Sequence, residues 1–362
     1  TVESTLPVYC DRSAAWIGAY PGDAAIPVTL HAGVIDSKFV HFEIIDSSPQ
    51  EAGEGGPPQL TFAVTESLIW FFAALLAWRN LRAGRGDRKG AIRLCIVVLV
   101  AFLLLYVINS AYLPSRDIAG LLQSLSGSNA LAHASMHACQ TWLGYIAVEP
   151  YLRRLWPRLL VTWTRLLDGR FRDPLLGRDV LFGCAFGGTL VFARAFWSAS
   201  PQWLGWPTDA PSYFVRMPMG GWRPTPVSLL GAFVGAIGVS VILIVLLLIC
   251  RIVFRKENLA FVMTTVLVAA VSWMTDSSPY GAVGQTIVVF FFLTILLRFG
   301  FLVFAATAYI FIVFDAHPIS FQFDHWQQPS AWTTYSVLAA FVVCSCASSL
   351  GGAKLFKGLD LT

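Results

Sequence analysis

The sequence is poor in charged residues: Asp, Glu, Lys and Arg make up 13% of its 362 residues, against about 25% in an average soluble domain. Hydrophobic residues account for 56%, and the mean hydropathy is +0.65. These values exclude an ordinary water-soluble fold. They predict an all-α polytopic membrane protein, with most of the chain in one bundle of helices that cross the bilayer.

The sequence also lacks the motifs of familiar enzyme classes. It contains no GxxxxGK[ST] phosphate loop and no set of kinase motifs, so it predicts no nucleotide site. The seven cysteines show neither a disulfide framework nor a zinc-binding spacing. We therefore expect no catalytic residue, cofactor or metal in this chain. Nucleic acid is not an expected partner, because membrane topology accounts for the basic loops.

Long apolar runs predict the membrane spans, and Gly, Pro and charged residues mark the loops between them. The predicted domain at 60–350 contains nine such runs: 60–78, 94–113, 130–148, 180–198, 227–250, 259–275, 282–297, 299–314 and 332–350.

The tract at 282–314 is interrupted only around Arg298. Because an arginine at the bilayer centre costs about 2.5–3.5 kcal/mol on insertion scales, we predict two spans here, with a tight turn at Arg298. The alternative is one tilted helix, which gives eight spans and an external C-terminal tail.

The cations are gathered in a few loops, and this predicts the orientation of the chain. The loop after the first span is placed in the cytoplasm by six cations: Arg79, Arg82, Arg85, Arg88, Lys89 and Arg93. Residues 1–59 are then extracytoplasmic. The alternation of spans agrees with every later loop: 114–129 and 199–226 are predicted outside, while 149–179, 251–258 and the tail 351–362 are predicted inside.

Residues 149–179 form a basic, amphipathic segment between two apolar runs. Within 155–167, Trp156 and Trp163 recur with leucines at helical spacing, which predicts a helix lying in the inner headgroup layer. The 149–179 segment contains seven arginines, and those that we expect to contact anionic inner-leaflet lipids include Arg153, Arg154, Arg158 and Arg165. The alternative is a linker helix packed against the bundle.

Residues 1–59 differ in kind from the rest of the chain. Apolar and polar residues alternate over 28–34 and again over 40–44, which predicts a β-hairpin that turns at 35–38. Because two strands are only marginally stable alone, we expect this hairpin to belong to a larger extracytoplasmic domain. The chain begins at Thr1 without a visible signal peptide, and we expect a fragment or a processed product.

His133 and His137 lie four residues apart in the third span and share one helix face. This spacing would allow metal binding or proton relay. The turn contains no carboxylate, and HASMH lacks the glutamate of an HExxH zinc protease. Two histidines that face the bundle without a catalytic role are the favoured interpretation.

Several long motifs resemble one known family: the C-terminal membrane region of large bacterial receptor-type serine/threonine protein kinases. The resemblance is strongest in WRNLRAGRGDRKGAIRL and EPYLRRLWPRLLVTWTRLLDGRFRDPLLGRDVLFG, and it extends to LLRFG, SAWTTYSVLAAFVV and LFKGLDL. IPVTLHAGVIDSKFVHFEII is similar to the end of the family's extracytoplasmic domain. The histidines of the third span and the long 199–226 loop depart from the family pattern.

The resemblance implies a bacterial cytoplasmic membrane and a kinase domain that lies before Thr1. No kinase residue can then be assigned to a position in this chain. We expect a non-catalytic anchoring or sensory module, with protein partners or a second copy bound through the bundle. The alternatives are an accessory structural subunit of a membrane complex, or a transporter or intramembrane enzyme that uses His133 and His137. The absence of an internal repeat disfavours transport.

Overall fold

The computed structural model describes residues 12–20, 23–35, 38–46, 57–110, 130–204, 225–275, 279–316 and 328–350. These residues are mostly helical. The chain divides into two compact units. One comprises Thr1–Leu60 with Ala199–Thr208, and the other comprises Thr61–Ser198 with Asp209–Thr362.

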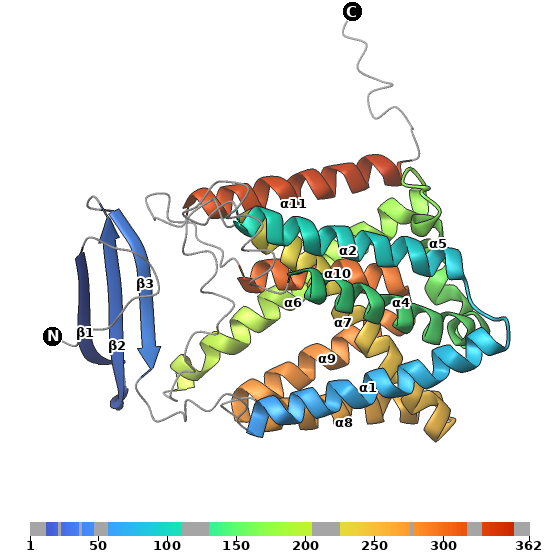
Figure 1. Cartoon of the computed structure of the whole chain (residues 1–362), viewed down its shortest axis with the longest axis horizontal. Coiled ribbons are helices and arrows are strands. Elements are labelled where there is room, and N and C mark those ends of the chain that lie inside the picture. Colours follow the sequence, from blue (N-terminus) through green and yellow to red (C-terminus); the bar gives the residue numbers. More distant parts are fainter. Residues whose placement is uncertain are drawn as a thin grey trace, which may run out of the picture. The chain divides into compact units, whose positions relative to one another are not determined.

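The first unit contains an antiparallel sheet with the strand order β1-β2-β3 (Figure 1). Its strands are β1 (Arg12–Tyr20), β2 (Asp23–Ile35) and β3 (Lys38–Asp46). The hairpin predicted from the alternation is confirmed, because β2 pairs with β3 and Ile35 lies opposite Lys38.

Strand β1 was not predicted. Its sequence, RSAAWIGAY, is dominated by small residues, so the alternation that marks a strand is faint. The pairing of Trp16 with Leu30 aligns β1 along β2. The third strand supplies part of the stability that a two-stranded hairpin lacks.

The second unit is a helix bundle. Within the described ranges, each of the nine runs predicted as spans coincides with a helix: α1 (Pro57–Arg82), α2 (Arg88–Ser110), α4 (Ala130–Leu155), α6 (Pro174–Leu204), α7 (Thr225–Phe254), α8 (Glu257–Thr275), α9 (Pro279–Phe299), α10 (Phe301–Ala316) and α11 (Gln328–Ser349). Two short elements, η1 (Pro157–Leu160) and α5 (Val161–Leu167), connect α4 to α6.

Six of these helices are long and apolar enough to cross a membrane: α2, α6, α7, α8, α9 and α11. This is the helix content of a multi-pass membrane protein. Helix α10 is apolar but shorter, and α1 and α4 are not among the six. Polar residues lower the hydropathy of these last two, including Glu66 in α1 and His133 and His137 in α4. Nine spans therefore stay a prediction.

The tract at 282–314 forms two helices rather than one. Helix α9 ends at Phe299, Gly300 adopts a φ of 106°, and α10 begins at Phe301. The ring of Phe292 lies edge-on to those of Phe304 and Phe311, at centroid distances of 5.6 and 5.5 Å. Helix α10 therefore folds back along α9. The predicted turn is confirmed, and the side chain of Arg298 is exposed beside it.

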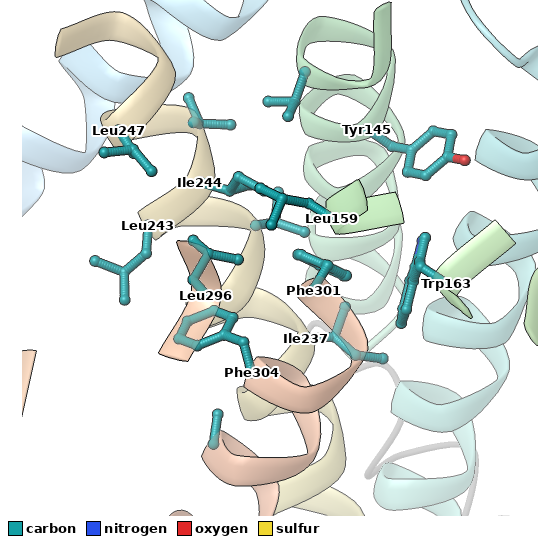
Figure 2. Packing of buried hydrophobic residues seen from close by; sticks show 14 of the residues in the cluster. Tyr145, Leu159, Trp163, Ile237, Leu243, Ile244, Leu247, Leu296, Phe301 and Phe304 are labelled. Atoms are coloured by element: carbon teal, nitrogen blue, oxygen red, sulfur yellow. The ribbon is translucent and has the colours of Figure 1, made fainter. Parts of the chain in front are cut away.

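The core lies between α4, α7, α9 and α10. Figure 2 shows Leu159, Ile244, Leu296 and Phe304 converging there from η1, α7, α9 and α10. Helix α7 is apolar on all sides and has the highest mean hydropathy of the six candidate spans, 3.1, as expected for a buried central helix. Large apolar side chains on the outer helices face outward instead, for example Ile92, Ile96, Val100 and Leu104 on α2.

Helix α6 approaches its neighbours closely through glycines. A Cβ on Gly183 or Gly187 would collide with Ala306 or Ile310 on α10. A Cβ on Gly177 would collide with the backbone of α11 at Ser345 and Ser349. Small residues allow helix backbones to approach in this way where no hydrophobic effect drives association.

Gly183→Leu should therefore destabilise the bundle by about 1–3 kcal/mol, since overpacking forces neighbouring side chains and backbone apart. Gly188→Leu is the matched control, because a side chain there meets no atom within 4 Å. Thermal unfolding of both variants in the same detergent measures the difference. Equal unfolding temperatures would show that α6 does not depend on this contact.

Candidate functional site

Five segments of the bundle meet at one end of it. The Asp87 backbone N–H donates to Glu149 at 3.2 Å, Arg93 donates to the carbonyl of Leu167 at 2.8 Å, and the Trp156 indole donates to Glu257 at 3.2 Å. A Cβ on Gly300 would lie 3.3 Å from the Leu159 carbonyl oxygen, and Ser348 donates to the Phe171 carbonyl at 3.1 Å. We call this region the basic end: residues 79–93, 149–179, 251–258, 298–300 and 345–350.

A proline explains the first contact that holds α1 to this end. Pro150 lies inside α4 and has no N–H, so the carbonyl of Ile146 loses its helical donor. Asn80, whose side chain is only 3% exposed, donates from Nδ2 to the carbonyls of Ile146 and Ala147 at 3.0 and 3.1 Å. The side chain at the end of α1 thus satisfies a backbone acceptor that α4 cannot satisfy itself.

Glu149 forms the second contact. Its side chain is 4% exposed and accepts hydrogen bonds from the Asp87 backbone N–H and from Nε of Arg153. Asp87 lies just before α2 and is its N-cap, because its carboxylate accepts a hydrogen bond from the Gly90 N–H at 2.9 Å. A buried charge is tolerated when it is paired and hydrogen-bonded. We call Asn80, Asp87, Glu149 and Arg153 the polar cluster.

The segment after α4 packs into the bundle and does not form one continuous surface helix. The chain breaks at Trp156, and Pro157 begins η1. Leu159 and Leu160 are buried, and Trp163 on α5, which is 4% exposed, meets the Phe301 ring edge-on at 4.6 Å (Figure 2). We predicted one helix over 155–167 with Trp163 at the lipid interface. The structure instead shows the alternative, in which this segment packs against the bundle. The helical spacing of apolar residues is the same whether lipid or protein covers that face.

The predicted cations occupy the surface of the basic end. Arg82 lies over the Trp78 ring at 4.0 Å, and Arg165 pairs with Asp173 at 2.7 Å. The exposed members of the predicted set form no ion pair with the described residues: Arg79, Arg82, Arg85, Arg88, Lys89, Arg154, Arg158 and Arg298. Arg153 is exposed as well, but it pairs with Glu149.

The acidic groups of this end are engaged internally. Within the described residues, each accepts a hydrogen bond from the protein: Asp87, Glu149, Asp168, Asp173, Asp179 and Glu257. The Leu175 N–H, which donates to Asp173 at 3.0 Å, lowers the pKa of that carboxyl group, and Arg165 adds to the effect. The outer surface is therefore left with a positive field.

His133 and His137 lie away from the basic end, in the first two turns of α4. The described residues contain no group of three or more His, Cys, Asp or Glu that could hold a metal ion. The His137 ring stacks on Phe102 of α2, with centroids 4.6 Å apart and planes 3° apart. His133 is exposed and His137 is half-buried, so the prediction that both histidines face the bundle holds only for His137.

Sequence reasoning missed Asn80. Pro150 inside an apolar run was the available signal, because it leaves a carbonyl that needs an outside donor. Nothing local identifies α1 as the helix that supplies this donor.

A cavity of about 20 Å³ lies beside the polar cluster, lined by Leu94, Tyr145, Leu160, Trp163 and Phe301 among others. This volume holds about one water molecule. The cavity therefore offers no room for a substrate.

Comparison of the chain with protein-family models, curated proteins and solved structures finds no match.

Asn80→Ala should leave the Ile146 carbonyl buried without a donor, at a cost of about 1–3 kcal/mol in unfolding free energy. Asn258→Ala, at an exposed position of α8, is the matched control. Thermal unfolding in detergent compares the two. If both variants unfold at the wild-type temperature, the Asn80 bonds do not stabilise the bundle.

Proposed function

We propose that this chain is a non-catalytic membrane module that anchors a signalling protein and couples an extracytoplasmic event to the cytoplasmic end of a helix bundle. One observation carries the proposal: Asn80, on the helix that follows the sheet in the sequence, is bonded to the backbone of α4 inside the bundle. In the proposed topology, α1 follows the extracytoplasmic segment in the sequence and is fastened to α4 at the basic end.

Signalling needs two arrangements of the bundle whose balance the signal changes. Helix α1 is suited to move, because much of its length is exposed, including Leu68, Phe71, Phe72 and Leu75. A shift of α1 acts directly on the Ile146–Ala147 turn through Asn80. Glu149, two residues further along α4, then carries the change to Asp87 and Arg153.

The exposed cations of the basic end support the proposed orientation. By the positive-inside rule, we propose that the basic end faces the cytoplasm and that residues 1–59 are extracytoplasmic. Each exposed Lys or Arg near an anionic surface contributes about 1 kcal/mol of attraction. We therefore propose anionic inner-leaflet lipids as the partners of this surface, in place of the indole anchoring expected for Trp163.

The identity of the signalling output rests on the sequence resemblance alone. It favours a serine/threonine kinase domain before Thr1, in a bacterial cytoplasmic membrane. A second candidate is an intramembrane enzyme or transporter that uses His133 and His137, which lie one turn apart on α4. Loss of activity on replacement of both histidines by Gln, with normal membrane insertion, would select that candidate.

The orientation is tested with single cysteines in a cysteine-free background. Ala14→Cys in β1 should react with a membrane-impermeant maleimide added to intact cells, and Arg154→Cys should react only after the membrane is opened. Both side chains are exposed, so the labelling depends only on whether the reagent reaches that side of the membrane. Labelling of Arg154→Cys in intact cells would reverse the proposed topology.

The coupling is tested in the native protein, after mass spectrometry of native membranes establishes whether kinase peptides precede Thr1. Asn80→Ala should change autophosphorylation at least severalfold at equal abundance, because it releases α1 from α4. Gly183→Leu is the control, since it destabilises the bundle between α6 and α10 without touching α1. Equal effects of the two substitutions would attribute the change to stability, and a native protein without kinase peptides would remove the kinase proposal.

A further inference from the structure

A small cavity in the core is lined by polar side chains from two elements. Tyr145 of α4 and Trp163 of α5 both line it, and they are 7% and 4% exposed (Figure 2). Glu149, one turn after Tyr145 and 4% exposed, lines the cavity as well. Most of the remaining lining is apolar and includes Leu94 of α2 and Phe301 of α10. The cavity thus brings polar groups from α4 and α5 together inside an apolar core.

Two of these polar groups have no partner within the described residues. The hydroxyl oxygen of Tyr145 and Nε1 of Trp163 are buried, and neither forms a hydrogen bond with the part of the chain that the structure describes. A Cβ on Gly90 would lie 3.0 Å from the Tyr145 oxygen, so this hydroxyl lies beside the first turn of α2. Native proteins leave few buried donors unpaired, because each costs the desolvation of its polar group. An unpaired N–H and an unpaired O–H beside one cavity therefore indicate a ligand that can form hydrogen bonds.

The volume of the cavity, about 20 Å³, limits that ligand to the size of one water molecule. A buried water needs about two to four polar partners. The lining supplies a donor in the Trp163 N–H, a donor or acceptor in the Tyr145 hydroxyl, and an acceptor in the Glu149 carboxylate. Glu149 already accepts hydrogen bonds from Asp87 and Arg153, but a carboxylate offers about four acceptor positions.

We propose that this cavity is a binding site for one ordered water molecule that joins α4 to α5. The water accepts hydrogen bonds from the Trp163 N–H and the Tyr145 hydroxyl, and it donates one to the Glu149 carboxylate. This arrangement satisfies both unpaired donors and adds a polar partner to a buried carboxylate. A cavity of the same volume with a wholly apolar lining would stay dry.

The water gives the Trp163 indole a directional contact in addition to its packing. The indole meets the Phe301 ring edge-on at 4.6 Å, and apolar packing of this kind is mainly non-directional. A hydrogen bond from Nε1 restricts the orientation of the ring. The water site goes beyond the proposed function, because it belongs to the bundle and is measured without a signalling output. Its failure would leave the proposed coupling through Asn80 untouched.

The experiment uses the full chain in lipid nanodiscs, with 15N-labelled tryptophan. The Trp163 indole signal is assigned by its loss in Trp163→Phe. Dipolar magnetisation transfer from water to the indole proton, separated from chemical exchange, should show a bound water in the wild type. Tyr145→Phe removes only the hydroxyl and should reduce that transfer by more than half, because the water loses a partner. The same substitution should lower the unfolding temperature by about 2–4 °C.

Tyr151→Phe is the matched control, because Tyr151 is a half-buried residue of α4 that does not line the cavity. It should change neither the indole signal nor the unfolding temperature, and effects equal to those of Tyr145→Phe would overturn the proposal.

Absence of water transfer to the Trp163 indole in the wild type would also overturn it, and this result does not require any variant to fold. An unfolding temperature of Tyr145→Phe at or above that of the wild type would do the same, because the loss of an unpaired buried hydroxyl relieves its desolvation cost. A lower unfolding temperature with an unchanged indole signal would assign the hydroxyl to a direct bond with Asp87 and refute the shared water.

Discussion

A proline and a glutamate in the same turn of α4 determine how the basic end is built. Pro150 leaves the Ile146 carbonyl without its helical donor, and Glu149 brings a carboxylate into a buried position. An unsatisfied carbonyl or an unpaired charge in such a place costs several times what its hydrogen bond contributes. Both groups are satisfied by residues distant in sequence, Asn80 and Asp87. The C-terminal end of α1 and the N-terminal end of α2 are therefore positioned by the unsatisfied groups of α4.

This arrangement also explains the surface charge of the same end. Its acidic side chains are used as caps and as partners of internal donors, as with Asp87 at the start of α2 and Asp173 at the start of α6. Cations outnumber these acids, and most of them are left on the surface. Internal structure and surface charge are thus linked, because the carboxylates that hold the turns together no longer offset the positive charge of the surface.

Much of the fold could be predicted from the sequence, and for physical reasons. A run of apolar residues long enough to span a bilayer is helical almost of necessity, because the backbone has no water to bond with. The turn at Gly300 followed from the cost of burying Arg298. The alternation of apolar and polar residues predicted β2 and β3, but the small residues of β1 showed no such pattern.

The candidate site was less predictable than the fold. The amphipathic pattern around Trp163 identified a buried face but not what packs against that face, because protein and lipid both select apolar residues there. The spacing of His133 and His137 likewise indicated a shared face and no partner. Asn80 acts across helices, and one sequence does not show directly which helices are neighbours. The local sequence thus showed that a polar group needed a partner, but it did not show which helix supplies that partner.

The face that α1 presents to the bundle shows why its polar ends matter. Ile69, Ala73, Ala77 and Asn80 recur at helical spacing and are all buried. Two alanines give this stripe little shape, so the stripe alone does not define the position of α1 along its neighbours. A displacement by one turn, about 5.4 Å, would keep an apolar stripe in contact. It would separate Asn80 from the Ile146 carbonyl, at the cost of a buried unpaired acceptor. The position of α1 is therefore set by its polar contacts, and a change in any one of them acts on the whole helix.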